Sequence, residues 1–134
     1  MTKLGLVVAQ FNESVTGPME ERAREAVAEH NAEIVETLSV PGSYDTPLAA
    51  DRLARRDAID AVVVIGAIVT GDTDHDRVIA DATAQGLMQV SLDRDKPVLF
   101  GVSGPGMSGA EARERVDKGA EAVYAAVEMV ESLA

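Results

Sequence analysis

The sequence contains no cysteine and no tryptophan, and aromatic residues make up 3% of its 134 residues. Without cysteine the chain has no disulfide framework, no thiolate nucleophile and no zinc–thiolate site. Its two histidines, His30 and His75, lie far apart in the sequence, which argues against a metal site built from imidazoles. We therefore expect neither a metal centre nor cysteine chemistry.

Long apolar runs are also absent. No stretch reaches the roughly 18 apolar residues that a membrane-spanning helix requires, so we expect no membrane partner. Residues 1–5 already have the composition of a strand and leave no room for a signal peptide. A length of 134 residues suits one domain, spanning 1–134, with one sizeable core. We expect a cytoplasmic protein.

Lysine is scarce, and the charge is strongly one-sided. The formal net charge is −11, with three lysines (Lys3, Lys96 and Lys118) and nine arginines. Such a surface repels nucleic acid and anionic lipid, so we expect neither as a partner. An anionic substrate would need a local cluster of positive charge. The composition is either that of an ordinary solvated acidic surface or, as a sharper hypothesis, an adaptation to a salty cytoplasm.

Short apolar runs alternate with segments of helical period, which is typical of repeated βα units around a parallel sheet. The pattern predicts strands over residues 3–10, 33–39, 60–67 and 97–102. It predicts helices over 16–30, with Pro18 at or near the start, over 46–56, from 74 to beyond 88, and from 108 to the end, with an interruption near 117–119. Right-handed crossovers then give a three-layer α/β/α sandwich with a four-stranded parallel sheet in the flavodoxin-like order 2-1-3-4.

Ligands of open parallel sheets bind beyond the carboxyl ends of the strands. Three of the four aromatic residues, Phe11, Tyr44 and Phe100, lie in the segments that end or follow predicted strands. Each alone could simply cover an edge of the sheet. Together they favour a site for a flat heterocycle, which aromatic faces and a few polar groups bind well.

The segment 66–75 combines an anion site with a proton carrier. The buried run 60–65 ends at Gly66 and is followed by Gly71, Thr73, Asp74 and His75. Backbone N–H groups at a helix N-terminus favour an anion, and histidine exchanges a proton near neutral pH. An ordinary turn with Asp74 as helix cap and an exposed histidine would have the same composition. The functional interpretation is chemistry on a small phosphorylated molecule.

Taken together, the segments resemble lumazine synthase, the family that makes 6,7-dimethyl-8-ribityllumazine in riboflavin biosynthesis. The resemblance runs from Leu4 to about Met129 and is carried by Phe11-Asn12, residues 40–47, 66–75 and 97–101, Glu114-Arg115, and residues 118–122. The Ser103–Met107 stretch and the short connection from Arg115 to Lys118 are most similar to the compact archaeal branch.

The resemblance implies a reaction and an assembly. The reaction is the condensation of 5-amino-6-ribitylamino-uracil with 3,4-dihydroxy-2-butanone 4-phosphate, which releases phosphate and water and needs neither a metal nor an organic cofactor. The assembly is a homopentamer, either free or closed into a 60-subunit icosahedral shell, with each active site between two subunits.

The resemblance also implies residue roles. Phe11 would stack on the pyrimidine, Asp45 would bind the ribityl chain, and His75 would be the general acid and base. Arg115 would be the charge partner of the phosphate, with Arg113 as the fallback. The remaining implied substrate contacts are Asn12, Gly42, Ser43, Tyr44, the backbone of Ile68 and Val69, the phosphate-binding Gly71, Asp72 and Thr73, and, with Arg115, the neighbouring subunit's copies of Phe100 and Lys118. Tyr44 departs from the family's usual phenylalanine.

Other functions remain open from the sequence. A flavin- or nucleotide-binding module of flavodoxin type needs a phosphate loop after the first strand, which residues 12–17 allow weakly and Glu13 disfavours. A noncatalytic shell subunit would not need an intact His75 and Arg115. Taken alone, Asp45 could cap the second helix, His30 is expected to be structural at a helix C-terminus, and Arg113 and Arg115 could form solvated ion pairs.

Overall fold

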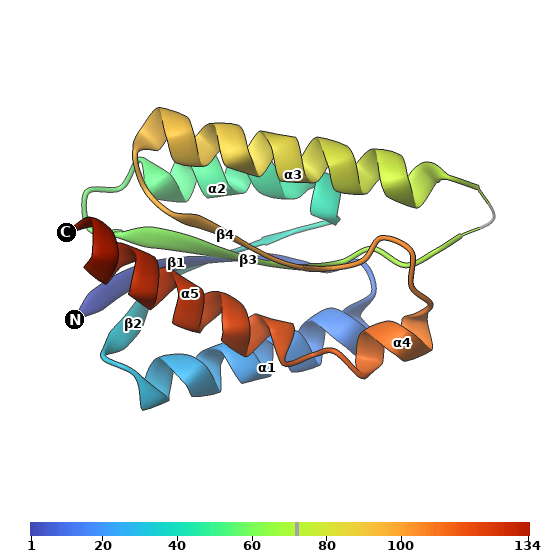
Figure 1. Ribbon diagram of the computed structural model, residues 1–134, viewed down its shortest axis with the longest axis horizontal. Helices are drawn as coiled ribbons and strands as arrows, with labels where there is room; N and C mark the ends of the chain where they lie inside the picture. The colour runs from blue at the N-terminus through green and yellow to red at the C-terminus, as the bar shows by residue number, and fades with distance from the viewer. Residues whose placement is uncertain (72) are drawn as a thin grey trace.

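The computed structural model describes residues 1–71 and 73–134 (Figure 1). Within them the strands are β1 (Thr2–Ala9), β2 (Ala32–Val40), β3 (Ala61–Ala67) and β4 (Val98–Ser103). The helices are α1 (Glu13–Glu29), the 3₁₀ turn η1 (Ser43–Asp45), α2 (Thr46–Ala54), α3 (His75–Arg94), α4 (Gly109–Arg113) and α5 (Lys118–Leu133). No helix of the described chain is long and apolar enough to cross a membrane.

The predicted sandwich is confirmed. The described strands pair in parallel in the order β2-β1-β3-β4. Helices α2 and α3 cover one face of the sheet, and α1, α4 and α5 lie on the other (Figure 1). Both chain termini lie at the end of the molecule opposite to the carboxyl ends of the strands, so the candidate site is far from either terminus.

Strand β3 forms the centre of the core. All seven of its residues are buried, as expected for a parallel strand covered on both faces. Alternate side chains point to opposite faces. Val63 and Ile65 therefore join the cluster under α1 and α5, whereas Val62 and Val64 join the cluster under α2 and α3. This packing holds the end of β3, where the site begins, against both helical layers.

Helix α1 begins earlier than predicted. It starts at Glu13 and contains Pro18, whereas the sequence pattern placed Pro18 at or near the first helical position. Asn12 adopts a left-handed backbone conformation with φ of 66°, and its carbonyl accepts the first bonds of the helix from the N–H groups of Val15 and Thr16. The prediction used proline as a start signal, whereas Pro18 is the sixth residue of α1, where it lacks the N–H that would donate to the Ser14 carbonyl.

The buried face of α3 also differs from the prediction. The helical spacing of Val78, Ile79, Ala82 and Leu87 in the sequence predicts that these side chains face the core, but Val78 and Ala82 are exposed, Val78 by 61%. The buried stripe is Asp76, Ala80, Thr83, Leu87 and Val90. Two helical stripes compete in this segment, and the one that faces the sheet contains two polar residues. A second set of apolar side chains, Val78, Met88 and Leu92, is left on the surface of the chain.

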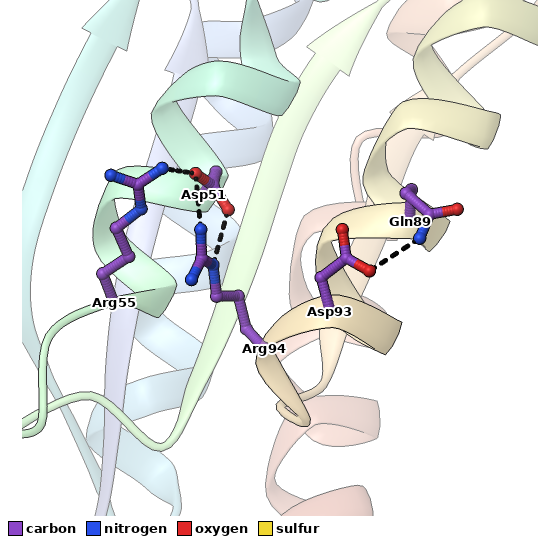
Figure 2. A network of polar contacts seen from close by, with 5 residues as sticks. All are labelled: Asp51, Arg55, Gln89, Asp93 and Arg94. Carbon is purple, nitrogen blue, oxygen red and sulfur yellow. Dashed lines mark hydrogen bonds and ion pairs between the residues drawn. The ribbon is translucent and has the colours of Figure 1, made fainter.

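An ion-pair network joins α2 to the last turn of α3 (Figure 2). The carboxylate of Asp51 is 2.7 Å from the Arg55 guanidinium and 2.8 Å from that of Arg94, and Gln89 donates to Asp93 at 2.7 Å on the neighbouring turn. The hydrogen bond from Arg94, followed by that from Arg55, lowers the pKa of Asp51 despite partial desolvation. The resulting stability is present above the ordinary carboxyl pKa and is lost as the pH falls through the lowered one.

The close contact of α5 with α1 gives a stability prediction. A β carbon at Gly119 would lie 2.1 Å from the Met19 carbonyl oxygen, so Gly119→Ala must push the helices apart. We expect it to lower the free energy of unfolding by about 1–3 kcal/mol, the usual cost of overpacking. Gly17→Ala is the matched control, because nothing lies within 4 Å of its β carbon. It should raise helix stability by up to about 1 kcal/mol. Denaturant unfolding measures both, and a Gly119→Ala variant as stable as Gly17→Ala would contradict the packing.

Candidate active site

A pocket of about 190 Å³ opens at the carboxyl ends of β1 and β3. It lies between η1, the segment after β3 and the first turns of α3. Its lining is mainly apolar and consists of Phe11, Asn12, Gly42, Ser43, Tyr44, Ala67, Ile68, Val69, His75, Asp76 and Ile79. Eight of the residues expected at the site are therefore brought together from segments far apart in the sequence. Asp45, on η1, is adjacent but does not line the pocket.

Two residues after β1 form one wall. The N–H of Phe11 donates to the Pro41 carbonyl at 2.8 Å, which continues the pairing of β1 with β2 past the strand ends. Asn12 donates from Nδ2 to the carbonyl of Ala67 at 3.0 Å and so ties this wall to the end of β3. The side chain of Phe11 is left 69% exposed at the pocket. An anchored backbone with an exposed ring suits stacking on a flat ligand.

The 3₁₀ turn η1 is fixed from two sides. The carbonyl of Ser43 accepts from the Thr46 hydroxyl at 2.7 Å and from the Thr83 hydroxyl at 3.3 Å. The carboxylate of Asp45 accepts from the Gly42 N–H at 3.0 Å. Asp45 occupies the N-cap position of α2, but its side chain makes no capping bond there. The interpretation of Asp45 as a side-chain cap of α2 is therefore wrong, because the carboxylate instead closes η1 by accepting from Gly42.

Ser43 packs directly on Gly66. A β carbon at Gly66 would lie 2.7 Å from the Ser43 hydroxyl oxygen, so only glycine fits beneath this side chain. The hydroxyl is fully buried and has no hydrogen-bond partner among the described residues. Because that oxygen is covered, a ligand in the pocket would meet the backbone of Ser43 and not its hydroxyl.

The start of α3 places His75 at the pocket. The N–H of His75 donates to the Thr73 hydroxyl at 3.2 Å. Asp74 holds the N-cap position, as the alternative interpretation of this segment had it, but its side chain makes no capping bond. Thr73 provides the side-chain oxygen at this helix start in its place. The exposed His75 side chain lines the pocket, where a proton carrier is useful. Asp72 lies outside the described residues.

A second, polar pocket adjoins the first. It is lined by Thr70, Gly71, Thr73, Asp74, Asp76, Arg77 and Gly106, and thus contains two of the expected phosphate residues. Its described charged side chains are two carboxylates and one guanidinium, Arg77. That balance is unfavourable for a phosphate, so an anion bound here needs positive charge from elsewhere.

Three expected residues lie apart from both pockets. Phe100 and Lys118 line a separate hollow on the open edge of the sheet, between β4 and α5, together with Leu99, Glu121, Ala122 and Ala125. Arg115 is exposed on the connection between α4 and α5, as is the fallback Arg113 at the end of α4. The described chain therefore has two separate clusters, one around His75 and one around Lys118.

Sequence reasoning missed several residues of the pockets. Asp76 and Ile79 line the first pocket, Arg77 lines the second, and Thr83 supports Ser43. A signal was present, because Asp76 and Thr83 belong to the regular series 76, 80, 83, 87 and 90 that the structure buries. Polar residues in an otherwise apolar series indicate buried side chains with defined partners. No group of three or more histidines or carboxylates in the described parts of the chain could hold a metal ion, and a metal-free reaction stays a prediction.

An apolar pocket lined by a histidine, next to a polar pocket and beyond the strand ends of a parallel α/β sandwich, is typical of a small-molecule enzyme. The model of the 6,7-dimethyl-8-ribityllumazine synthase family matches residues 1–134. Enzymes of that name are 71% identical over 133 residues in Halorubrum lacusprofundi, covering 99% of each chain, and in Halobacterium salinarum, covering 99% of this chain and 100% of the relative. The one from Methanoculleus marisnigri is 47% identical over 131 residues, covering 98% and 97%. The chain belongs to the 6,7-dimethyl-8-ribityllumazine synthase family, and a flavodoxin-type binding module is not favoured.

The contact of Ser43 with Gly66 is testable by a double-mutant cycle. Gly66→Ala should lower the free energy of unfolding by about 1–3 kcal/mol, because the added methyl group overpacks the Ser43 hydroxyl. Ser43→Ala removes a buried, unpaired oxygen and should be neutral or stabilising. The double variant should regain most of the loss, since the β carbon at 66 would then meet Val102 Cγ2 at 3.4 Å and Ser43 Cβ at 3.6 Å, both ordinary van der Waals contacts. Additive effects in denaturant unfolding would show that the two sites are not in contact.

Proposed function

We propose that this chain condenses 5-amino-6-ribitylamino-uracil with 3,4-dihydroxy-2-butanone 4-phosphate to give 6,7-dimethyl-8-ribityllumazine, phosphate and water. One observation supports this most directly. The exposed ring of Phe11 and the side chain of His75 line the same apolar pocket, and the polar pocket with Gly71 and Thr73 adjoins it. A flat pyrimidine and a short phosphorylated ketone would then meet beside an imidazole.

The pyrimidine binds in the apolar pocket. Phe11 stacks on its ring, the backbone of Ile68 and Val69 faces its edge, and the turn from Gly42 to Tyr44 closes the other side. The carboxylate of Asp45, held beside the Gly42 N–H, accepts hydrogen bonds from the ribityl hydroxyls. Tyr44 is 62% exposed, so the hydroxyl that distinguishes it from phenylalanine can remain in water.

The phosphate binds in the polar pocket, on Gly71, Asp72 and Thr73. A phosphate beside the carboxylates of that pocket requires a strong cation, and guanidinium offers a bidentate fork. Arg115 supplies it from a neighbouring copy of the chain, with Arg113 as the fallback. Arg77 lies at the same pocket within the chain and adds a second positive charge.

The reaction needs proton transfers and alignment of two small molecules. The 5-amino group attacks the ketone, and loss of water gives an imine. A proton leaves the neighbouring carbon as the C–O bond to phosphate breaks, and the second amine closes the ring with loss of another water. His75 accepts and donates these protons, which suits an imidazole because one ring nitrogen can accept a proton while the other donates one. Holding both substrates together lowers the barrier further by removing the entropic cost of their encounter.

We propose that the complete site forms between two copies of the chain. The apolar pocket, at about 190 Å³, is smaller than the roughly 300–1,000 Å³ of complete small-molecule sites. The cluster with Phe100 and Lys118 lies on the open edge of β4. Beside it an apolar groove of about 430 Å³ runs along Leu87, Met88, Val98, Phe100 and Met129. A pentamer would bury this groove and bring Lys118, Phe100 and Arg115 to the neighbour's His75; pentamers either stay free or close into a 60-subunit shell.

The acidic surface fits a high-salt cytoplasm. The chain carries a net charge of −11, and the relatives from Halorubrum lacusprofundi and Halobacterium salinarum, at 71% identity, are from halophilic archaea. Molar salt screens the mutual repulsion of carboxylates, which destabilises an acidic chain in dilute buffer. We propose that the chain works in the cytoplasm at high ionic strength.

The function is tested by mixing the two substrates with the protein and following lumazine absorbance and phosphate release. We expect both signals to rise together, faster than the uncatalysed reaction, and to persist in molar KCl. His75→Ala should lower kcat by roughly 10²–10⁴-fold, the usual contribution of a general acid–base group. No acceleration by the unaltered protein in dilute or molar KCl would exclude the function, and unchanged kinetics in His75→Ala would exclude the role of the histidine.

The shared site is tested by complementation. His75→Ala and Arg115→Ala should each be nearly inactive, the second mainly through a raised KM for the phosphorylated substrate. Unfolded together at equal amounts and reassembled, they should regain activity, because roughly a quarter of sites between two subunits would then have both side chains intact. The matched control replaces Arg115→Ala by Arg113→Ala in the same mixture with His75→Ala. It shows whether the loss and recovery of activity belong to Arg115 or to the fallback Arg113. No recovery in mixtures that light scattering shows to be co-assembled would contradict a site built from two chains.

A further inference from the structure

The carboxylate of Asp76 lies in the site but has none of the roles proposed above. It does not stack on the pyrimidine, bind the phosphate or transfer protons. Asp76 follows His75 in the first turn of α3 and is 8% exposed. It lines both the apolar pocket and the polar pocket and thus lies at their junction. A carboxylate is favourable at a helix N-terminus but unfavourable beside a bound phosphate. Charge alone therefore does not explain why a carboxylate occupies position 76.

A hydrogen bond from the neighbouring loop supplies that reason. The carboxylate Oδ2 of Asp76 accepts from the N–H of Gly106 at 3.2 Å. Gly106 has φ of 80° and lies in the loop that follows β4. This bond joins the loop to the helix that carries His75, across 30 residues of sequence.

The same loop supports residues 68–70, which form the wall between the proposed pyrimidine and phosphate positions. The N–H of Ile68 donates to the Ser103 carbonyl at 2.7 Å, and the N–H of Thr70 donates to the Met107 carbonyl at 2.8 Å. Gly104 packs on this wall so closely that a β carbon there would lie 1.9 Å from the Ile68 carbonyl oxygen. The wall 68–70, the loop 103–107 and the first turn of α3 therefore form a closed ring, and Asp76 provides its link to the helix.

We propose that Asp76 is a positioning residue. It holds the loop 103–107 against the start of α3, and so fixes the wall 68–70 at the distance from His75 that the phosphorylated substrate requires. This inference rests on the proposed function. A displacement of about 1 Å at such a wall is enough to cost up to about 10²-fold in rate. The expected consequence is larger for the phosphorylated substrate, because the pyrimidine, although it also meets the backbone of Ile68 and Val69, is held mainly by Phe11 and η1.

Two variants separate positioning from charge. Asp76→Ala breaks the ring, and we expect KM for the butanone phosphate to rise roughly tenfold or more, as for loss of a hydrogen bond to a charged group. KM for the pyrimidine should change by less than about threefold. Asp76→Asn keeps an oxygen that accepts from Gly106 and removes the repulsion of the phosphate, so its KM should equal or fall below that of the unaltered protein. Charge alone predicts that both variants bind the phosphate more tightly, and that result would overturn the proposal.

Hydrogen exchange gives a readout that does not depend on turnover. In the assembled protein, the peptide 103–107 should exchange faster in Asp76→Ala than in Asp76→Asn or the unaltered chain. Asp81→Asn, which removes the same charge from an exposed position on α3, is the matched control and should change neither exchange nor KM. Should the alanine variant not fold, Asp76→Ser replaces it, because its hydroxyl is one bond too short to reach Gly106. Equal exchange in all variants refutes the link itself, whereas failure of the unaltered protein to condense the substrates refutes only the proposed function.

Discussion

The parallel pairing of β1 with β3 determines where the residues of the pocket lie, because it brings the segments after both strands to one edge of the sheet. The Asn12 side chain then spans from one segment to the other by donating to Ala67, and η1 is held over Gly66 by the Thr46 and Thr83 hydroxyls. The burial of β3 on both faces holds this edge between the two helical layers. Each side chain at the pocket thus depends on the sheet for its position more than on its own neighbours in sequence.

The sequence predicted the parts of the site that follow directly from strand order. Phe11, Ser43 and His75 lie after three successive strands, and parallel pairing alone places such segments side by side. The order of the strands and the central position of β3 could also be predicted from the sequence. The two-cluster arrangement was available from the family resemblance only, since nothing in spacing or periodicity indicates that Lys118 lies away from His75.

The errors have a common physical origin. Helical period identifies apolar stripes but not which stripe faces the sheet, so Val78 was expected inside and Asp76 was overlooked. Residue preference identifies groups that can cap a helix, but Asp45 closes η1 and Thr73, not Asp74, bonds the first turn of α3. In each case local preference was correct about the type of residue, and tertiary geometry decided which partner it met.

The open edge at β4 carries a consequence for how activity depends on the amount of protein. A folded chain on its own presents the His75 cluster and the Lys118 cluster at different places on its surface. In the proposed assembly, working sites appear only when chains meet, so output rises more steeply than in proportion to the number of chains made. A cell with few copies would hold correctly folded protein and yet have almost no flux through this step.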